Sequence, residues 1–179
     1  MKTYKVEGII LKRSNLGEAD KILTVFTKEE GKIKLLAKSI RKITSRKAGS
    51  LELFNQVKLL LVKGKNLDII TEVVVVNDFS FWRTDLKKVG VAYYLTELVD
   101  KLTPEKQEQY LVFSFLQESF NSLNKGNATK IILNFEKKLL NELGFGLPQS
   151  FDTQKSLKNY IEKITEKRIN SPKIIREIW

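Results

Sequence analysis

The residues of this sequence that are best suited to chemistry are seven basic side chains without a counter-charge. No aspartate or glutamate lies between Glu30 and Glu52, and the cations in that interval are Lys32, Lys34, Lys38, Arg41, Lys42, Arg46 and Lys47. Like charges repel one another, and a fold accommodates them more easily when a polyanion binds there. The chemistry expected of this run is therefore neutralisation of a phosphate backbone. The alternative is a lysine-rich face that is only solvated.

Other chemistries lack the residues that they need. The chain of 179 residues has no cysteine and no histidine, which excludes disulfides, thiol nucleophiles, zinc fingers and histidine general bases. Glycine-rich phosphate loops and the Gly-x-Ser-x-Gly elbow are also absent. Glu18 and Asp20 are close in sequence, but such residues at a turn more often bind backbone amides than form a paired-carboxylate site. We expect neither an enzyme nor a bound metal or other cofactor.

The composition favours a nucleic-acid partner and sets limits on location. There are 32 basic and 21 acidic residues, which gives a formal net charge of +11, and a strongly positive protein attracts polyanions. Residues 1–5 lead directly into an alternating pattern and lack the apolar core of a secretory signal. No apolar segment has the length of a membrane span. We therefore expect no membrane contact and a cytoplasmic, nucleoid-associated location.

Up to about residue 78 the apolar residues recur with a period of two, which is typical of half-buried strands. Segment 32–38 is the clearest case, because its lysines are expected on one face and its core residues on the other, namely Ile33, Leu35 and Ala37. Strand patterns also cover 4–12, 21–27, 57–62 and 67–76, with turns at 29–31 and 63–66. Five short strands favour a small closed barrel, since closure removes exposed sheet edges.

After residue 78 the apolar period becomes 3.6, which predicts helices. One stripe ends at residue 102, and Thr103 followed by Pro104 predicts an N-cap and the start of a second helix to about residue 123. A third stripe begins at residue 128, and Gly144 is expected to end it in a left-handed cap. Further helices are predicted near 157–164 and after 171.

The change of period predicts an α+β protein of two domains. A five-stranded barrel occupies residues 1–78, and an all-α helical domain occupies residues 79–179. Such barrels bind single strands through basic grooves and aromatic stacking platforms. The barrel segment offers few aromatic candidates, and each is better explained as core, namely Tyr4, Phe26 and Phe54. Strong charge with weak stacking predicts backbone binding with little sequence preference.

Several motifs, in order along most of the chain, are similar to those of the bacterial recombination mediator family RecO. In the barrel segment they are GIILKR at 8–13, GEADKILT at 17–24, GKI at 31–33, AKSIRK at 37–42 and SR at 45–46. In the helical segment they are AYYLTEL at 92–98, FEKKLLNELGF at 135–145, LKNYI at 157–161 and NSP at 170–172. None of these motifs is unique by itself, and their combination is what makes the resemblance specific.

The resemblance implies an OB-fold barrel, a helical domain and a role in DNA repair and homologous recombination after DNA damage. It implies binding of single- and double-stranded DNA, annealing of complementary strands coated by single-strand-binding protein, and loading of recombinase together with RecR. We expect DNA contacts from Lys12, Arg13, Lys32, Lys34, Lys38, Arg41, Lys42, Arg46 and Lys47. The acidic tail of single-strand-binding protein is expected near Lys130, Lys137 and Lys138, which otherwise form a solvated helix face.

Two departures from the family pattern have structural consequences. The family often has glycine where Ser39 stands, so the basic loop is expected to turn differently here. Many members also carry a zinc-finger-like insertion after a Gly-Phe/Tyr-x-x-x-Pro segment, whereas this chain passes from Pro148 to its next predicted helix within a few residues. The resemblance is thus to a compact member of the family that lacks the zinc-finger-like insertion.

Two other functions are compatible with the residues. An RNA-binding or ribosome-associated OB-fold protein would use the same stacking and phosphate contacts without annealing. A scaffold protein would use its basic surface to bind an acidic protein. Preference for RNA over DNA of equal length favours the first, and binding that survives nuclease treatment favours the second.

Overall fold

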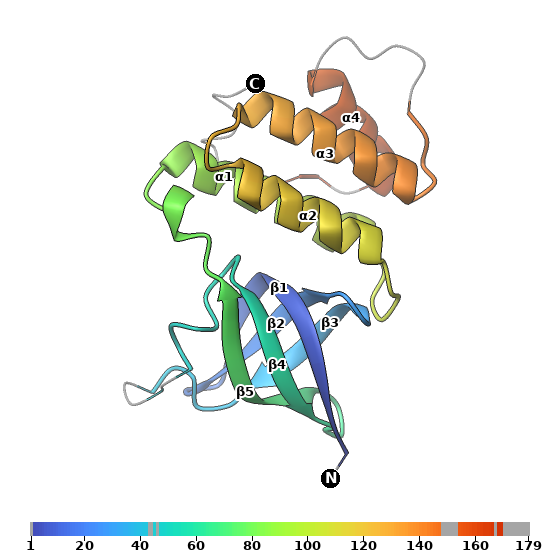
Figure 1. Ribbon diagram of the computed structural model, residues 1–179. Helices are drawn as coiled ribbons and strands as arrows, with labels where there is room; N and C mark the ends of the chain where they lie inside the picture. The colour runs from blue at the N-terminus through green and yellow to red at the C-terminus, as the bar shows by residue number, and fades with distance from the viewer. Residues whose placement is uncertain (1, 43–44, 46, 148–153, 167, 170–179) are drawn as a thin grey trace. The chain divides into compact units, whose positions relative to one another are not determined.

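The computed structural model describes residues 2–42, 45, 47–147, 154–166 and 168–169 (Figure 1). The described residues up to Asp78, together with Pro104–Phe113, form one compact unit. The described residues of Phe79–Thr103 and those from Ser114 onward form a second unit. Within the described ranges, every helix is too short or too polar to cross a bilayer.

The first unit is the five-stranded barrel that the sequence predicts. Its strands are β1 (Thr3–Leu16), β2 (Asp20–Thr27), β3 (Gly31–Ala37), β4 (Gln56–Val62) and β5 (Asp68–Asn77). They close in the order β1-β2-β3-β5-β4, with β3 and β5 parallel and the other pairs antiparallel (Figure 1). This small closed barrel followed by helices confirms the predicted α+β class with an N-terminal OB-fold.

The barrel interior follows the alternation seen in the sequence. The three predicted core residues of β3 are at most 4% exposed and pack with residues of the other strands, namely Ile33, Leu35 and Ala37. On the outer face Lys34 and Lys38 are exposed as predicted, but Lys32 is buried. The reason is tertiary, because the chain returns over β3 after α1 and the Lys106 N–H donates to the Lys32 carbonyl at 2.9 Å.

The second unit contains a short 3-10 turn (Ser80–Trp82), α1 (Leu86–Leu102), α3 (Ala128–Glu142), α4 (Gln154–Thr165) and most of α2 (Tyr110–Ser122). Its centre is aromatic, since the buried Trp82 ring packs edge-on against Phe120 and its Nε1–H donates to the Phe120 carbonyl at 3.0 Å. Gly144 has φ 76°, which confirms the left-handed end of the third helix. The helix predicted after residue 171 lies outside the described residues.

The prediction that Thr103 and Pro104 begin a helix is wrong. Thr103 instead ends α1, because its N–H and its Oγ1–H both donate to the Val99 carbonyl, at 3.1 and 2.6 Å. The next helix begins at Tyr110. The intervening residues pair with β3 through Glu105 and Lys106, so a tertiary contact overrides a local capping signal.

Candidate nucleic-acid interface

From Lys38 onward, the described part of the basic run lies in the loop between β3 and β4, whereas Lys32 and Lys34 belong to β3. This loop is fixed to the barrel by apolar side chains on both sides of the cations, since Ile40 is 3% exposed, Leu51 is fully buried and both belong to the barrel core. Between these two anchors, Arg41 and Lys42 are exposed. Arg41 and Lys42 are therefore presented outward while Ile40 and Leu51 remain in the core.

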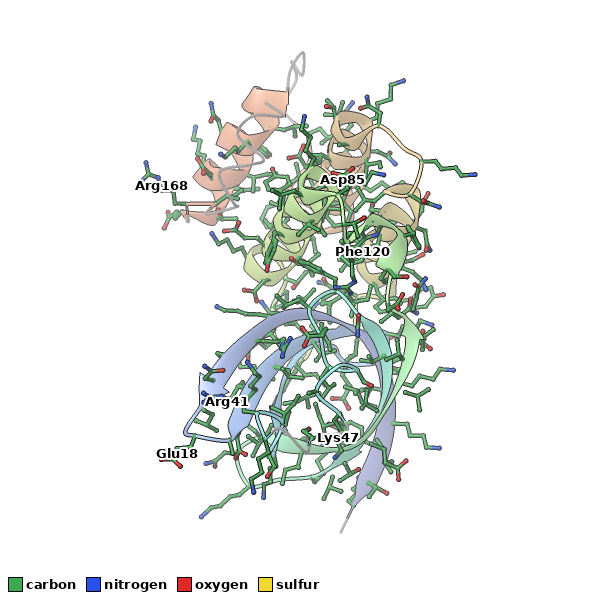
Figure 2. The ribbon with its side chains drawn as sticks, turned by 90° about the vertical axis from the view of Figure 1, so that its left-hand side faces the viewer. Glu18, Arg41, Lys47, Asp85, Phe120 and Arg168 are labelled. Carbon is green, nitrogen blue, oxygen red and sulfur yellow. The ribbon has the colours of Figure 1, made fainter. Side chains whose placement is uncertain are left out.

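The first part of the loop is bound to the turn between β1 and β2. The Ser39 N–H donates to Asp20 Oδ1 at 2.7 Å, and the Arg41 N–H donates to the Ala19 carbonyl at 3.0 Å. The Arg41 guanidinium also donates, through Nη1, to the Gly17 carbonyl at 2.8 Å. Figure 2 shows Arg41 beside the turn that carries Glu18, at one end of the barrel. Asp20 thus binds a backbone amide, as the sequence predicts.

Ser39 adopts the conformation that glycine favours. Its φ is 56°, in the left-handed region that costs a residue with a Cβ on the order of 1 kcal/mol. The expectation that the loop turns differently here than in the resembling family stays a prediction, and this chain accepts the strain of a left-handed residue at Ser39.

A second group of cations lies on the outer face of the sheet. Lys12 of β1 pairs in register with Thr24 of β2, which pairs with Lys34 of β3, so both exposed lysines lie in one row across three strands. Lys34 Nζ lies 2.5 Å from Glu105 Oε1, and this contact holds the pKa of the glutamate below its usual range. A phosphate that binds Lys34 would have to compete with Glu105.

Three other predicted residues are less accessible. Arg13 is half-buried and forms an ion pair with Glu52. Lys32 is 7% exposed. Lys47 is half-buried, and its Nζ lies 3.4 Å from the Ile70 carbonyl. Arg46 lies outside the described residues. The exposed members of the predicted set are therefore Lys12, Lys34, Lys38, Arg41 and Lys42.

The structure adds lysines that the sequence analysis did not select. Lys63, Lys65 and Lys106 line a cleft of about 600 Å³ together with Lys34. The loop between β4 and β5 belongs to the usual binding surface of OB-folds, so two lysines in the predicted turn 63–66 were a usable signal. Acidic residues line the same cleft, namely Glu29, Glu30, Asp68, Glu105 and Glu108. This mixed charge makes the cleft a weaker phosphate site than the loop.

The aromatic residues of the barrel give little surface for stacking. Phe26 is fully buried and Phe54 is 3% exposed, which confirms both as core. Tyr4 is half-buried, its hydroxyl donates to Asp68 at 2.5 Å, and Lys63 Nζ lies 4.3 Å from its ring centroid. Burial, and then the hydrogen bond to Asp68, raise the pKa of Tyr4 to about 12. The arrangement favours phosphate contacts over base stacking.

The lysines of the predicted tail site lie on α3, away from its buried face. Lys130 is exposed, whereas Lys137 and Lys138 are half-exposed. Lys138 Nζ lies 2.8 Å from Glu118 Oε2 and 5.2 Å from the ring centroid of Phe115.

In the part of the chain that the structure describes, no three acidic, histidine or cysteine side chains gather as a metal site would require.

Comparison with known proteins identifies both units. Residues 1–79 match the family model described as the N-terminal domain of recombination protein O, and residues 83–155 match its C-terminal domain. A DNA repair protein RecO of Roseiflexus sp. (strain RS-1) is 40% identical over 152 residues, which are 84% of this chain and 53% of the relative. A RecO of Pelotomaculum thermopropionicum is 38% identical over 145 residues, 81% of this chain and 57% of the relative.

The chain spans about half the length of the curated relatives that it matches. The similarity nevertheless covers the barrel and most of the helices in one continuous order. It agrees with the closed barrel followed by helices, and the matched residues include the motifs at 8–46 and 92–145. The chain belongs to the recombination protein O (RecO) family.

Proposed function

We propose that this protein binds DNA during recombinational repair and promotes annealing of complementary strands. The observation that carries the proposal is a basic loop fixed on an OB-fold barrel in a chain of the RecO family. The substrates are single- and double-stranded DNA, including strands coated by single-strand-binding protein. With RecR as partner, the protein assists the loading of recombinase.

The mechanism is charge neutralisation, in which no covalent bond is made or broken. Lys38, Arg41 and Lys42 are exposed on the loop, and Lys12 and Lys34 are exposed on the adjoining strands. By lowering the repulsion between two phosphate backbones, these cations allow two strands to approach and test their pairing. Few aromatic side chains are exposed on the barrel, so contacts to the backbone dominate and many sequences are accepted.

The salt dependence of binding tests this mechanism. If ~4 cations contact single-stranded phosphates, the slope of log K against log salt is near −3. Replacement of Arg41, Lys42 and Arg46 together by alanine is expected to flatten the slope. A matched control replaces three lysines elsewhere on the chain, namely Lys87, Lys125 and Lys163, which are exposed on the helical unit. An unchanged slope in the loop variant would remove the loop from the interface.

We propose that α3 recognises single-strand-binding protein. Lys130 and Lys137 offer positive charge to an acidic tail, and Lys138 lies close to Phe115 as well as Glu118. A basic helix face suits an acidic peptide through complementary charge. This site is separate from the loop in sequence, so a coated strand can engage the protein through two contacts.

The function is tested by annealing of two complementary DNA strands, one of them fluorescently labelled. The strands are used bare and after coating by single-strand-binding protein, and a parallel reaction uses RNA of equal sequence. Acceleration on coated DNA is expected, whereas a generic basic protein is blocked by the coat. Tight binding without acceleration on any substrate would refute the annealing role, and preference for RNA would support an RNA-binding protein instead.

A further inference from the structure

An acidic residue lies inside the basic surface of the barrel. Asp20 is the first residue of β2, and the register that pairs Lys21 with Ala37 places it next to Lys38 at the end of the ladder. A carboxylate at this position repels a phosphate backbone. Its presence in a surface that binds a polyanion needs a structural reason.

That reason is a set of three hydrogen bonds, which we call the hairpin latch. It consists of the bond from the Ser39 N–H to Asp20 Oδ1, that from the Arg41 N–H to the Ala19 carbonyl, and that from Arg41 Nη1 to the Gly17 carbonyl. The Asp20 bond is the only one of the three made to a charged acceptor, and such bonds are short and strong; here the distance is 2.7 Å.

The latch fixes the direction of the Arg41 side chain. A guanidinium has five N–H donors in a rigid fork, and the latch uses one of them on Gly17. The other donors can bind a phosphate bidentately. Ser39, at φ 56°, is a strained residue beside this side chain, and the Asp20 carboxylate supplies a strong bond at that residue.

We propose that Asp20 is a positioning residue, whose carboxylate oxygen orders residues 39–41 and so presents Arg41 to the phosphate backbone; this inference rests on the proposed function. Without the acceptor, the loop samples other conformations in the free protein. The ordering cost then falls on the binding step and weakens it. An acidic residue thus increases affinity for an acidic ligand.

Two substitutions separate the acceptor from the charge. Asp20→Ala removes both, so electrostatics alone predicts tighter binding, whereas loss of the latch predicts weaker binding. Asp20→Asn removes the charge and keeps an oxygen acceptor. For a fluorescent single-stranded oligothymidylate at fixed salt, we expect D20A to bind about three- to tenfold more weakly than wild type. We expect D20N to bind as tightly as wild type or more tightly.

A double-mutant cycle tests whether Asp20 acts through Arg41. R41A alone is expected to weaken binding, and D20A is expected to add almost nothing in the R41A background. The salt slope of D20A should stay close to that of wild type, because the Arg41 contact still forms in the complex and only the cost of ordering the loop is added. Circular dichroism of each variant reports whether the fold is retained.

One measurement needs no variant. The amide hydrogens of Ser39 and Arg41 are expected to exchange slowly in the free wild-type protein, because both donate within the latch. Exchange at the rate of an open loop would overturn the proposal, and this check applies even if D20A does not fold.

The binding results have equally definite meanings. D20A binding that equals or exceeds wild type overturns the proposal, and so do equal losses in D20N and D20A or additive losses in the cycle. Wild-type protein that binds no DNA refutes the proposed function and this inference with it. Wild-type binding with an unaffected D20A refutes the inference alone.

Discussion

The helical unit contains a buried carboxyl group whose ionisation should control stability. Glu136 of α3 is fully buried, and the Tyr94 hydroxyl of α1 donates to its Oε1. The other carboxyl oxygen has no hydrogen-bond partner among the described residues. Burial raises the pKa of Glu136 from 4.5 to about 8, although the Tyr94 hydrogen bond acts in the opposite direction. Glu136 is therefore mainly protonated in the folded protein at neutral pH.

The sign of the pH effect follows from the two pKa values. The unfolded chain releases this proton near pH 4.5 and the folded protein near pH 8, so the unfolded state is increasingly favoured between these values. The contribution of Glu136 to the free energy of unfolding is greatest below pH 4.5. This contribution is lost by about pH 8. Each unit of pKa difference corresponds to about 1.4 kcal/mol. The full effect is thus at most roughly 5 kcal/mol.

Glu136→Gln is the informative change, because glutamine resembles the protonated acid and does not titrate. Its oxygen can still accept from Tyr94, while its amide hydrogens lack a partner, at a cost of about 1–3 kcal/mol that does not depend on pH. Urea unfolding followed by circular dichroism is measured from pH 5 to pH 9. We expect the free energy of unfolding of wild type to fall by several kcal/mol over this range and that of E136Q to stay nearly constant.

The chain is well suited to this measurement, because it has no histidine and few other groups titrate between pH 5 and 8. Glu142→Gln is the matched control, since Glu142 is an exposed carboxylate at the end of the same helix. E142Q is expected to keep the pH dependence of wild type. If wild-type stability is flat across this range, or if E136Q changes with pH as wild type does, the account of a buried neutral acid is refuted.

Further substitutions in the barrel and on α3 test other features. Ser39→Gly is expected to stabilise the barrel by up to about 1 kcal/mol, because it removes left-handed strain, and a lower urea midpoint would contradict this. At Gly31 (φ 65°) a Cβ would lie 1.8 Å from a backbone oxygen of the segment after α1, so Gly31→Ala should cost more than ~2 kcal/mol in urea unfolding. Gly17→Ala should cost less, since nothing lies within 4 Å of its Cβ position. Lys130→Glu with Lys137→Glu should weaken anisotropy-measured binding of an acidic tail peptide about tenfold, and unchanged affinity would place the tail elsewhere.

The barrel could be predicted from the sequence because each strand and turn is indicated by residues within its own segment. Alternating apolar residues define each strand, and the glycine of the 29–31 turn has the positive φ that such a turn needs, 65° at Gly31. Because the apolar residues of β3 all lie on one face, they also fix the register of β3 against its neighbouring strands. A slip by one residue would turn these core residues toward solvent. Strand boundaries were less predictable, and β1 continues four residues beyond the predicted end, to Leu16.

The errors share one physical cause, which is contact between residues distant in sequence. The burial of Lys32 and the absence of a helix at Thr103 both follow from the return of residues 104–113 over β3. Neither the alternation at 32–38 nor the Thr-Pro pair contains information on that contact. Local propensity is a weak guide where such pairing competes with it.

Charge along the sequence identifies the candidate interface but does not identify which cations are available to DNA. The run contains seven cations without indicating which are exposed, whereas the fold buries Lys32, draws Lys47 toward a barrel carbonyl and holds Lys34 close to Glu105. The strongest remaining site is Arg41, and its direction depends on carbonyls of the β1–β2 turn and on the acidic Asp20. Replacing Asp20 by a neutral residue that cannot accept the Ser39 hydrogen bond would make this surface more positive. It would nevertheless lower the affinity for DNA, because the latch is lost. The salt slope and the affinity should then change independently, because the first counts phosphate contacts and the second also includes the cost of ordering the loop.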